Sequence, residues 1–363
     1  MNSKDIYYAT EKDIFDLLAS KRKHFTKDVL LELCKDRGII CSNDEDKDRL
    51  IEYISILPYA YQDLASLLDQ VQINTRGDKK ISTKIDIPFN VSLIQNAVNK
   101  IKEVRGEEKK EVFSVVAESD SKIVVDVSYT ELDYGATRLK QRVDRNDRIE
   151  IIKNDDGGIY LRLPSNERMQ ELKNVVALSV IGESTDVKPK EINLSGVRIP
   201  EARTKFFLTL IQSTNGLKLH DVSSIKVAAI SDQAIEEIED DGDDIDIIQQ
   251  EIVGKLQNAI LQGSDLLKTI EYKSLIDKGF YICSIIWNTV DNNHDKYQFE
   301  ASFSDTENCN NFVYSLRGVY KWKEDKYTST RRAIEGLEKN ELLRTVEKAA
   351  EESFDKIVRE YCS

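Results

Sequence analysis

The sequence of 363 residues lacks the patterns that identify most common enzymes and metalloproteins. Its five cysteines are scattered and form no CxxC pair, so neither a zinc knuckle nor a dithiol redox motif is indicated. Its three histidines lie far apart in the sequence, which disfavours a histidine-based metal site or catalytic triad. There is no GxxxxGK(S/T) phosphate loop, no GxGxxG after a strand and no GxSxG elbow. These absences count against the common NTPases, dehydrogenases and hydrolases.

Long apolar runs are also missing. No run approaches the roughly 20 residues that a membrane-spanning helix needs. The opening residues MNSKDIYYATEKD are polar and lack the apolar centre of a secretory signal. Cysteines without a pairing pattern are typical of reduced thiols in a cytoplasm. We therefore expect a cytoplasmic protein with no metal and no cofactor.

The composition favours a globular fold with an acidic surface. Hydrophobic residues make up 40% of the chain and charged residues 32%, which predicts real cores beneath a well-solvated surface. Acidic residues outnumber basic ones, and the formal net charge is −13. Because such a surface repels phosphate, any contact with nucleic acid must come from a local basic patch.

The patterning predicts an α+β protein: a small all-helical N-terminal head, then a larger mixed body with antiparallel sheets and a C-terminal helix. VFSVVA and KIVVDVSY around a Glu-Ser-Asp-Ser turn, and RIEIIK and GIYLRL around a Gly-containing turn, predict β-hairpins. FYICSIIW and YQFEASF predict another, with FVYSLRGVYKW as a third strand. The expected domains are residues 1–73, 84–232 and 245–363, with a linker at Asn74–Thr83, an acidic loop at Glu236–Asp246 and a helix from Ile247 to Leu261.

A helical hairpin between Phe25 and Pro58 is the most informative segment of the head. Thr26 precedes an apolar helical face and is placed to cap its N-terminus. Gly38 follows that helix, as expected where a helix ends in a left-handed turn. Ser42 and Glu45 fit a capping box for the second helix.

This hairpin resembles the SAP-type helix–extended–helix module and, less closely, the LEM and Rho N-terminal modules. The resemblance is carried by VLLELCKDRGI (Val29–Ile39) and DKDRLIEYI (Asp46–Ile54) and covers only this hairpin. It implies binding to a DNA or RNA backbone through basic residues at the helix starts and in the crossing. The matching positions are Lys27, Lys35, Arg37, Lys47 and Arg49, with Lys21, Arg22 and Lys23 just upstream.

The hairpin departs from that pattern at the start of its second helix. Asp44, Glu45, Asp46 and Asp48 place negative charge there. These carboxylates suit the helix dipole but repel phosphate. A head that docks onto another protein is therefore the alternative.

A second basic segment lies at YGATRLKQRVDRNDR (Tyr134–Arg148). Arg138, Lys140 and Arg142 alternate, so on a strand they would point to one face and could follow a row of phosphates. The alternative is a solvent-facing strand whose basic side chains pair with acidic side chains of a neighbouring strand.

Two groups of residues offer a metal-dependent nuclease as a rival function. Asp126, Glu131 and Asp133 lie close to a predicted strand end, and carboxylates there could hold Mg²⁺. Alternatively, Asp126 simply faces solvent.

In TIEYKSL, Glu271 and Lys273 form an E-x-K pair with Asp265 upstream, which resembles the restriction-type nuclease core. In that core the carboxylates hold the metal and the lysine assists the attacking water. The distance from Asp265 to Glu271 is too short for the usual intervening hairpin, and the segment continues a helical pattern.

The favoured hypothesis is a non-enzymatic, bacterial-type, nucleic-acid-binding accessory or scaffold protein. By analogy with similar subunits, it would act in a multiprotein DNA-processing or phage-defence assembly. It would contact the DNA backbone and bind a protein partner or a second copy of itself. The alternatives are the metal-dependent nuclease and a protein–protein interaction subunit without nucleic-acid contact.

Overall fold

The computed structural model describes residues 8–22, 25–71, 79–182, 187–229, 258–263 and 266–361. The protein is α+β, as predicted, with antiparallel strands and a long C-terminal helix. The chain forms two compact units. Unit 1 comprises Met1–Thr75, Gln95–Glu118 and Val124–Arg148, and unit 2 comprises Arg76–Ile94, Ser119–Ile123 and Ile149–Ser363. The sequence predicted three domains and placed the hairpin VFSVVA–KIVVDVSY in the second one, residues 84–232. In the structure most of this hairpin belongs to unit 1, together with the helical head.

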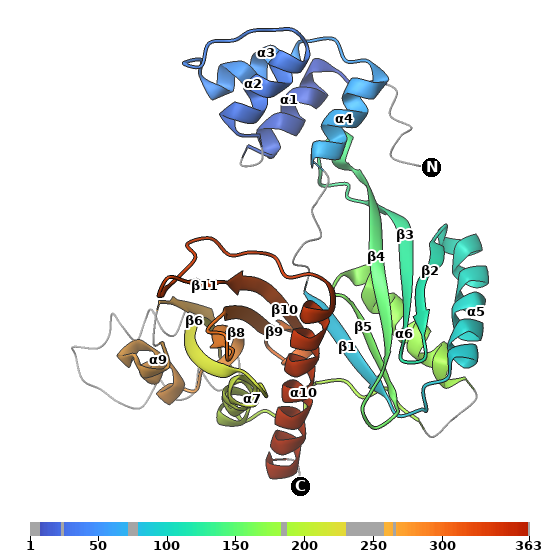
Figure 1. The fold of residues 1–363 in the computed structure, drawn as a ribbon, viewed down its shortest axis with the longest axis vertical. Coiled ribbons are helices and arrows are strands. Elements are labelled where there is room, and N and C mark those ends of the chain that lie inside the picture. The colour runs from blue at the N-terminus through green and yellow to red at the C-terminus, as the bar shows by residue number, and fades with distance from the viewer. Residues whose placement is uncertain are drawn as a thin grey trace, which may run out of the picture. The chain divides into compact units, whose positions relative to one another are not determined.

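The head of unit 1 is a group of short helices (Figure 1). These helices share one apolar core. Its helices are α1 (Glu11–Ser20), α2 (Lys27–Asp36), α3 (Lys47–Ser55) and α4 (Tyr61–Val71). Leu17, Leu30 and Leu50 from three of these helices are fully buried together. Residues 26–57 contain helices and turns but no strand, which confirms the predicted all-helical hairpin.

The helix ends follow from local capping. Thr10 and Asp13 form a capping box at α1, and Thr26 Oγ1 accepts the N–H of Val29 at α2. Gly38 has the left-handed conformation expected after α2, with φ +72°. The predicted capping box of Ser42 and Glu45 is wrong: α3 starts later, after Asp46, and the Ser42 hydroxyl accepts the N–H of Asp44.

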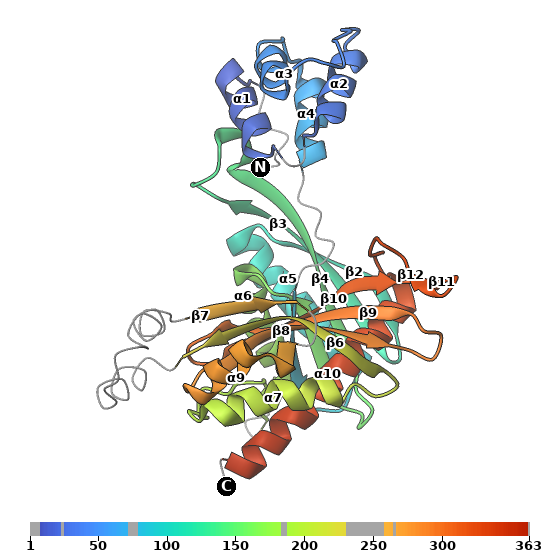
Figure 2. The same ribbon diagram turned by 90° about the vertical axis from the view of Figure 1, so that its left-hand side faces the viewer.

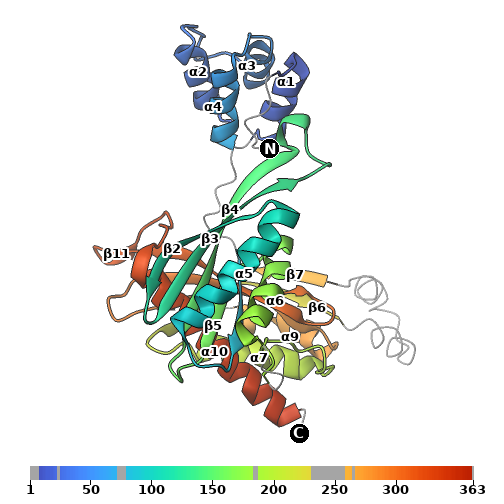
Figure 3. The same cartoon turned by 90° about the vertical axis from the view of Figure 1, so that its right-hand side faces the viewer.

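The remainder of unit 1 is built from β2 (Val112–Ser119), β3 (Lys122–Leu132) and β4 (Arg142–Lys153), adjacent in that order. Helix α5 (Val91–Lys109) lies against the β2–β3 hairpin (Figure 3). The short 3-10 helix η2 (Arg138–Lys140) lies in the connection between β3 and β4. Two of the predicted hairpins, β2–β3 and the one that β4 forms with β5 (Ile159–Pro164), are confirmed.

Unit 2 contains an antiparallel sheet in the order β5-β1-β10-β9-β8-β6-β7, with the end of β4 paired to β5. The register places Thr83 opposite Leu161 and Ser284 opposite Ser302. The strands are β1 (Lys80–Ile85), β5 (Ile159–Pro164), β6 (Lys218–Ala228), β7 (Asn258–Gln262), β8 (Tyr281–Val290), β9 (Lys296–Asp305) and β10 (Asn310–Tyr320), with the small pair β11 (Trp322–Lys323) and β12 (Lys326–Tyr327).

The core of unit 2 is aromatic and lies between the sheet and its helices. Helices α7 (Pro200–Gln212) and α10 (Gly336–Tyr361) pack on the same face of the sheet (Figure 2). Phe206 of α7 contacts Phe303 with ring centroids 5.6 Å apart, and Trp287 stacks on Phe299 at 5.4 Å. The other helices of unit 2 are α6 (Glu167–Ile181), α9 (Ile270–Asp277) and the 3-10 helix η3 (Leu266–Lys268).

Two predicted segments of the body differ from the structure, and a third lies outside the described residues. The predicted helix from Ile247 to Leu261 is wrong in its described part, because residues 258–262 form strand β7, in which Ile260 pairs with Lys226. The predicted linker Asn74–Thr83 includes the first residues of strand β1. The acidic segment Glu236–Asp246 lies outside the described residues. Among the helices that the structure describes, none is both long and apolar enough to cross a membrane.

Candidate interaction surface of unit 1

The connection between β3 and β4, residues 133–141, packs into the core of the helical head. Leu139 is fully buried in the same apolar cluster as Leu17 and Leu50. Beside it, Arg138 Nη1 donates to Asp13 Oδ2 at 2.8 Å. Burial opposes ionisation of Asp13, but hydrogen bonds from Thr10 and the Arg138 guanidinium outweigh it and hold the pKa of this carboxyl below its ordinary value. The head and this connection thus form one surface.

The predicted row of basic side chains on one strand is not formed. Residues 138–140 form the 3-10 helix η2, and only Arg142 belongs to strand β4. Arg138 is paired with Asp13, and the Lys140 side chain lies outside the described part. The predicted placement of Arg138, Lys140 and Arg142 on one strand is therefore wrong.

The rest of this basic segment pairs with carboxylates across the β3–β4 hairpin. Arg145 Nε donates to Glu131 Oε2 at 2.7 Å. Arg148 makes two hydrogen bonds to Asp126, at 2.7 and 3.2 Å. The alternative that the sequence left open, a strand paired with acidic side chains of its neighbour, is the one that the structure shows.

The same contacts occupy the first group of candidate metal ligands. Asp126 and Glu131 accept hydrogen bonds from arginines, and Asp133 Oδ1 accepts the N–H of Gly135 at 2.9 Å. Within the described ranges, no three His, Cys, Asp or Glu side chains are arranged to hold a metal ion.

The E-x-K group is not on a strand either. Glu271 and Lys273 are exposed side chains of helix α9, so the strand that a restriction-type core requires is absent at this position. Asp265 lies outside the described residues. The geometry therefore gives no support to this nuclease site.

Four basic residues of the head that the SAP-like pattern singles out are already engaged. Arg22 pairs with Asp48 at 2.7 Å, and Arg49 lies 3.6 Å from Glu45. Lys47 Nζ donates to the backbone oxygen of Arg22 at 2.6 Å. Together with Arg37, described next, these residues make up half of the basic positions that the resemblance assigns to phosphate binding. The side chains of all four are bound to carboxylates or backbone oxygens of the protein itself.

Arg37 is held by three groups at the connection between α3 and α4. It donates to the Pro58 oxygen at 2.8 Å, lies 3.3 Å from Asp63, and places its guanidinium 4.1 Å from the centre of the Tyr59 ring. This last contact is a cation–π interaction.

Among the basic positions that the SAP-like pattern singles out, Lys21, Lys27 and Lys35 remain. In the part of the chain that the structure describes, none of the three forms an ion pair, and Lys35 is exposed. Lys23 lies outside the described residues. Over residues 1–75, acidic side chains outnumber basic ones.

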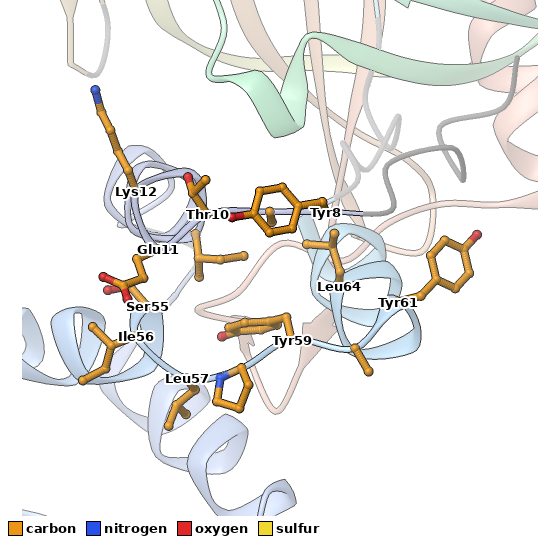
Figure 4. Close-up of a pocket in the computed structure, with 14 residues that line it drawn as sticks. Tyr8, Thr10, Glu11, Lys12, Ser55, Ile56, Leu57, Tyr59, Tyr61 and Leu64 are labelled. Atoms are coloured by element: carbon orange, nitrogen blue, oxygen red, sulfur yellow. The ribbon is translucent and has the colours of Figure 1, made fainter.

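A pocket of about 560 Å³ opens on the head between the start of α1, the α3–α4 connection and α4. In Figure 4 the rings of Tyr8 and Tyr59 face this cavity, with Leu64 beside them, while Tyr61 points outward. Burial raises the pKa of Tyr59 to about 12, so its phenol stays protonated and donates to the Ile54 oxygen at 3.1 Å. The half-exposed Ile56 and the carboxylate of Glu11 also line the pocket.

Exposed aromatic side chains are concentrated on this unit. Among the described residues, every Phe, Tyr or Trp classed as exposed lies in the head or in the β3–β4 connection. They are Tyr8 (68%), Phe15 (39%), Tyr53 (40%), Tyr61 (40%) and Tyr134 (80%). Sequence analysis did not single out these side chains, because Phe15 and Tyr61 lie in amphipathic helices and no local pattern distinguishes an exposed aromatic residue from a buried one such as Phe25.

Comparison of the sequence with protein-family models and with curated proteins gave no match. The SAP-like resemblance stays a prediction that rests on the hairpin alone. The interpretation of the surface therefore depends on its own geometry.

Proposed function

We propose that this chain is a protein-interaction subunit that binds a partner protein through the head and the β3–β4 connection of unit 1. The observation that carries the proposal is the confinement of exposed aromatic side chains to this unit in the described part of the chain. Aromatic residues are enriched in protein interfaces and supply most of their hot spots. Unit 2, whose described aromatic side chains are buried or partly buried, serves as the supporting body.

The chemistry of the pocket favours a partner segment that carries Lys or Arg beside an apolar side chain. Tyrosine rings attract cations, as the contact between Arg37 and Tyr59 illustrates. Glu11 and Lys12 both line this pocket, so its charged lining is balanced, but the head as a whole has an excess of acidic residues. Ile56 and Leu64 offer apolar contacts next to these groups. A basic and apolar segment therefore matches the acidic excess of the head and the aromatic and apolar lining of the pocket.

The proposal is tested with the full chain expressed in its native host. A variant with Tyr8→Ser and Tyr61→Ser should lose the proteins that co-purify with the wild type. A matched control carries Ile270→Ser and Leu337→Ser, because these two side chains of unit 2 are each 82% exposed. The control should retain the same partner. A partner that survives the tyrosine changes, or that is lost equally from both variants, refutes the proposal.

A nucleic-acid backbone is the second candidate partner. It is favoured by the absence of ion pairs at Lys21, Lys27 and Lys35 within the described residues, and by exposed tyrosines that could stack on bases. Each neutralised phosphate of duplex DNA contributes about −0.9 to the slope of log K against log salt. Replacing the three lysines by Gln should therefore shallow that slope by roughly two to three units. Absence of binding at low salt would reject this candidate and, with it, a DNA-processing or phage-defence role through DNA contact.

A further inference from the structure

Unit 2 carries a group of aromatic rings outside its buried core, around the small β11–β12 pair at one end of the sheet (Figure 2). We call it the ring cluster, and its members are His220 of β6, His294 of the turn between β8 and β9, Trp322 of β11 and Tyr327 of β12. The centroids of the Trp322 and Tyr327 rings are 4.7 Å apart. Each histidine adds a contact at 6.0 Å, His220 with Tyr327 and His294 with Trp322. Both histidines are exposed and the other two rings are partly buried, so four rings in succession reach the surface.

The backbone departs from regular geometry where it presents these rings. The register between β6 and β8 shifts at His220, which is an extra residue in β6. A bulge of this kind changes the direction of a side chain. His294 has φ +65°, and Glu324 and Asp325, which form the turn between β11 and β12, have φ +48° and +60°. Non-glycine residues adopt this left-handed conformation at a cost, and such residues are concentrated at ligand-binding and active sites.

The chain around β11 and β12 is basic, although the protein as a whole is acidic. Residues 317–332 contain six basic and two acidic side chains, whereas the net charge of the whole chain is −13. Lys323 and Lys326 lie opposite each other in the β11–β12 pair, and like charges in that arrangement repel. Within the described residues, neither of these lysines nor Arg332 forms an ion pair, and all three are exposed. An anionic ligand would offset the repulsion.

A cation also lies against the ring cluster. Lys296 Nζ is 4.3 Å from the centre of the Tyr327 ring. The carboxylate of Asp295, on the β8–β9 turn, does not offset this charge, because it is already bound. Its Oδ2 accepts from Lys321 Nζ at 2.6 Å, and its Oδ1 accepts the N–H of Trp322 at 3.0 Å. Asp295 thus fastens the hairpin to the turn and leaves the surrounding cations to face solvent.

We propose that the ring cluster and the basic side chains around it bind a single strand of RNA or DNA. Sites that hold single strands combine aromatic rings, on which bases stack, with lysine and arginine along the phosphates. An acidic polypeptide would satisfy the cations but would leave the four rings unused. The proposal gives unit 2 a role beyond support of the head, and it does not depend on the partner proposed for the head.

The test uses the full chain and fluorescence anisotropy with labelled oligo(U) and oligo(dT) of about 15 nucleotides, near the upper length that one such site covers. At low salt we expect at least one of them to bind more tightly than a duplex of the same length, because pairing hides the faces of the bases. Trp322→Ala with Tyr327→Ala should weaken binding about tenfold or more, since it removes the stacking surface. Trp322→Phe with Tyr327→Phe keeps two rings and should retain most of the affinity.

The lysines of the hairpin give a second readout. Each phosphate neutralised on a single strand contributes about −0.7 to the slope of log K against log salt, so Lys323→Gln with Lys326→Gln should shallow the slope by about 1.4 units. Lys273→Gln with Lys278→Gln is the matched control, because it removes the same charge from exposed lysines on α9 and at its end. The control should leave the slope unchanged.

A variant of the head separates this site from any contact that unit 1 makes. It carries Lys21→Gln, Lys27→Gln and Lys35→Gln, and should bind the single strand as the wild type does. Circular dichroism and thermal unfolding identify a ring variant that fails to fold, and the lysine variant, which keeps all four rings, then decides. The proposal is overturned if neither oligonucleotide binds at low salt, or if the folded alanine variant or the lysine variant behaves as the wild type. It is also overturned if poly-glutamate displaces the strand as readily as an unlabelled oligonucleotide, which would indicate an acidic protein partner.

Discussion

The two units differ in whether they leave aromatic side chains exposed to solvent. Unit 2 buries its large aromatic residues: Phe206, Phe303 and Trp287 are all at most 2% exposed. Unit 1 exposes Tyr8 and Tyr134 to 68% and 80%. Since aromatic burial is a major source of stability, a unit that leaves such side chains in solvent forgoes that gain. This contrast is the ground on which we propose that unit 1 binds a partner while unit 2 supplies stability.

Arginines show the same contrast. Arg162 of β5 has a side chain only 1% exposed, and it binds Glu347 at 2.5 Å and Glu150 at 2.8 Å. Tyr314 donates a further hydrogen bond to Glu347. In unit 1, Arg148 also forms a two-pronged pair, with Asp126, but its side chain is 58% exposed. A buried pair leaves an uncompensated charge when one partner is removed, whereas water replaces the partner at an exposed pair.

The largest effect is expected from Arg162→Met. It leaves Glu347 and Glu150 without their buried cation, and should lower the free energy of unfolding by about 3–5 kcal/mol. The same replacement at Arg148 should cost less than about 1 kcal/mol. Urea unfolding of both variants measures the difference. Equal losses would contradict the contrast between the two units.

The buried pair also predicts a dependence on pH. Burial opposes ionisation of Glu150, but Arg162 and Lys122 outweigh it and lower its pKa below the ordinary value of 4.5. A lowered folded-state pKa contributes stability above pH 4.5 that is lost as the pH falls toward the folded-state value. The Glu150→Gln variant should therefore lose less stability than the wild type between pH 6 and about pH 3. A parallel loss in both proteins would show that Glu150 is not responsible.

The next effect concerns the head. Leu50 is 1% exposed, so Leu50→Ala should destabilise the head by about 2–5 kcal/mol. Leu33 is only partly buried, and Leu33→Ala should cost less. Hydrogen exchange of amides in α1 to α3 reports the loss in the full chain. If Leu33→Ala proved the more damaging change, the packing described for the head would be wrong.

The smallest effect is expected at Arg138. Its side chain is 55% exposed and its pair with Asp13 is solvated, so Arg138→Gln should cost about 0.2–1 kcal/mol. Hydrogen exchange at Thr10 to Ile14 should change only slightly. A loss as large as that of Leu50→Ala would mean that the ion pair, rather than Leu139, holds the connection to the head.

Much of the fold follows from local patterns. Hairpins β4–β5 and β8–β9 were predicted from alternating apolar residues around turns, because a short turn forces neighbouring strands to pair. Thr26 and Gly38 were predicted as helix ends because capping acts within a few residues. These signals do not depend on the rest of the chain.

The candidate surface was less predictable because it depends on partners distant in sequence. Leu139 completes a core whose other members lie some seventy or more residues earlier, and no local pattern near Leu139 indicates this. The phosphate-binding row was predicted at Arg138, Lys140 and Arg142, but residues 138–140 form a 3-10 helix. The neighbouring Arg145 and Arg148 pair with the cross-strand acids Glu131 and Asp126, which no local pattern indicates. Ile260 suited a helical period as well as a strand, and pairing with β6 decided between them.

The central claim, that unit 1 binds a protein partner through its exposed aromatic side chains, is tested most directly by affinity. The partner recovered with the wild-type chain is purified, and its Kd is measured by calorimetry against three full-length proteins: wild type, Tyr8→Ser/Tyr61→Ser, and Ile270→Ser/Leu337→Ser. We expect the tyrosine variant to bind at least about tenfold more weakly with an unchanged Tm, and the unit 2 variant to bind as the wild type does. An unchanged Kd for the tyrosine variant together with weaker binding by the unit 2 variant would contradict the account.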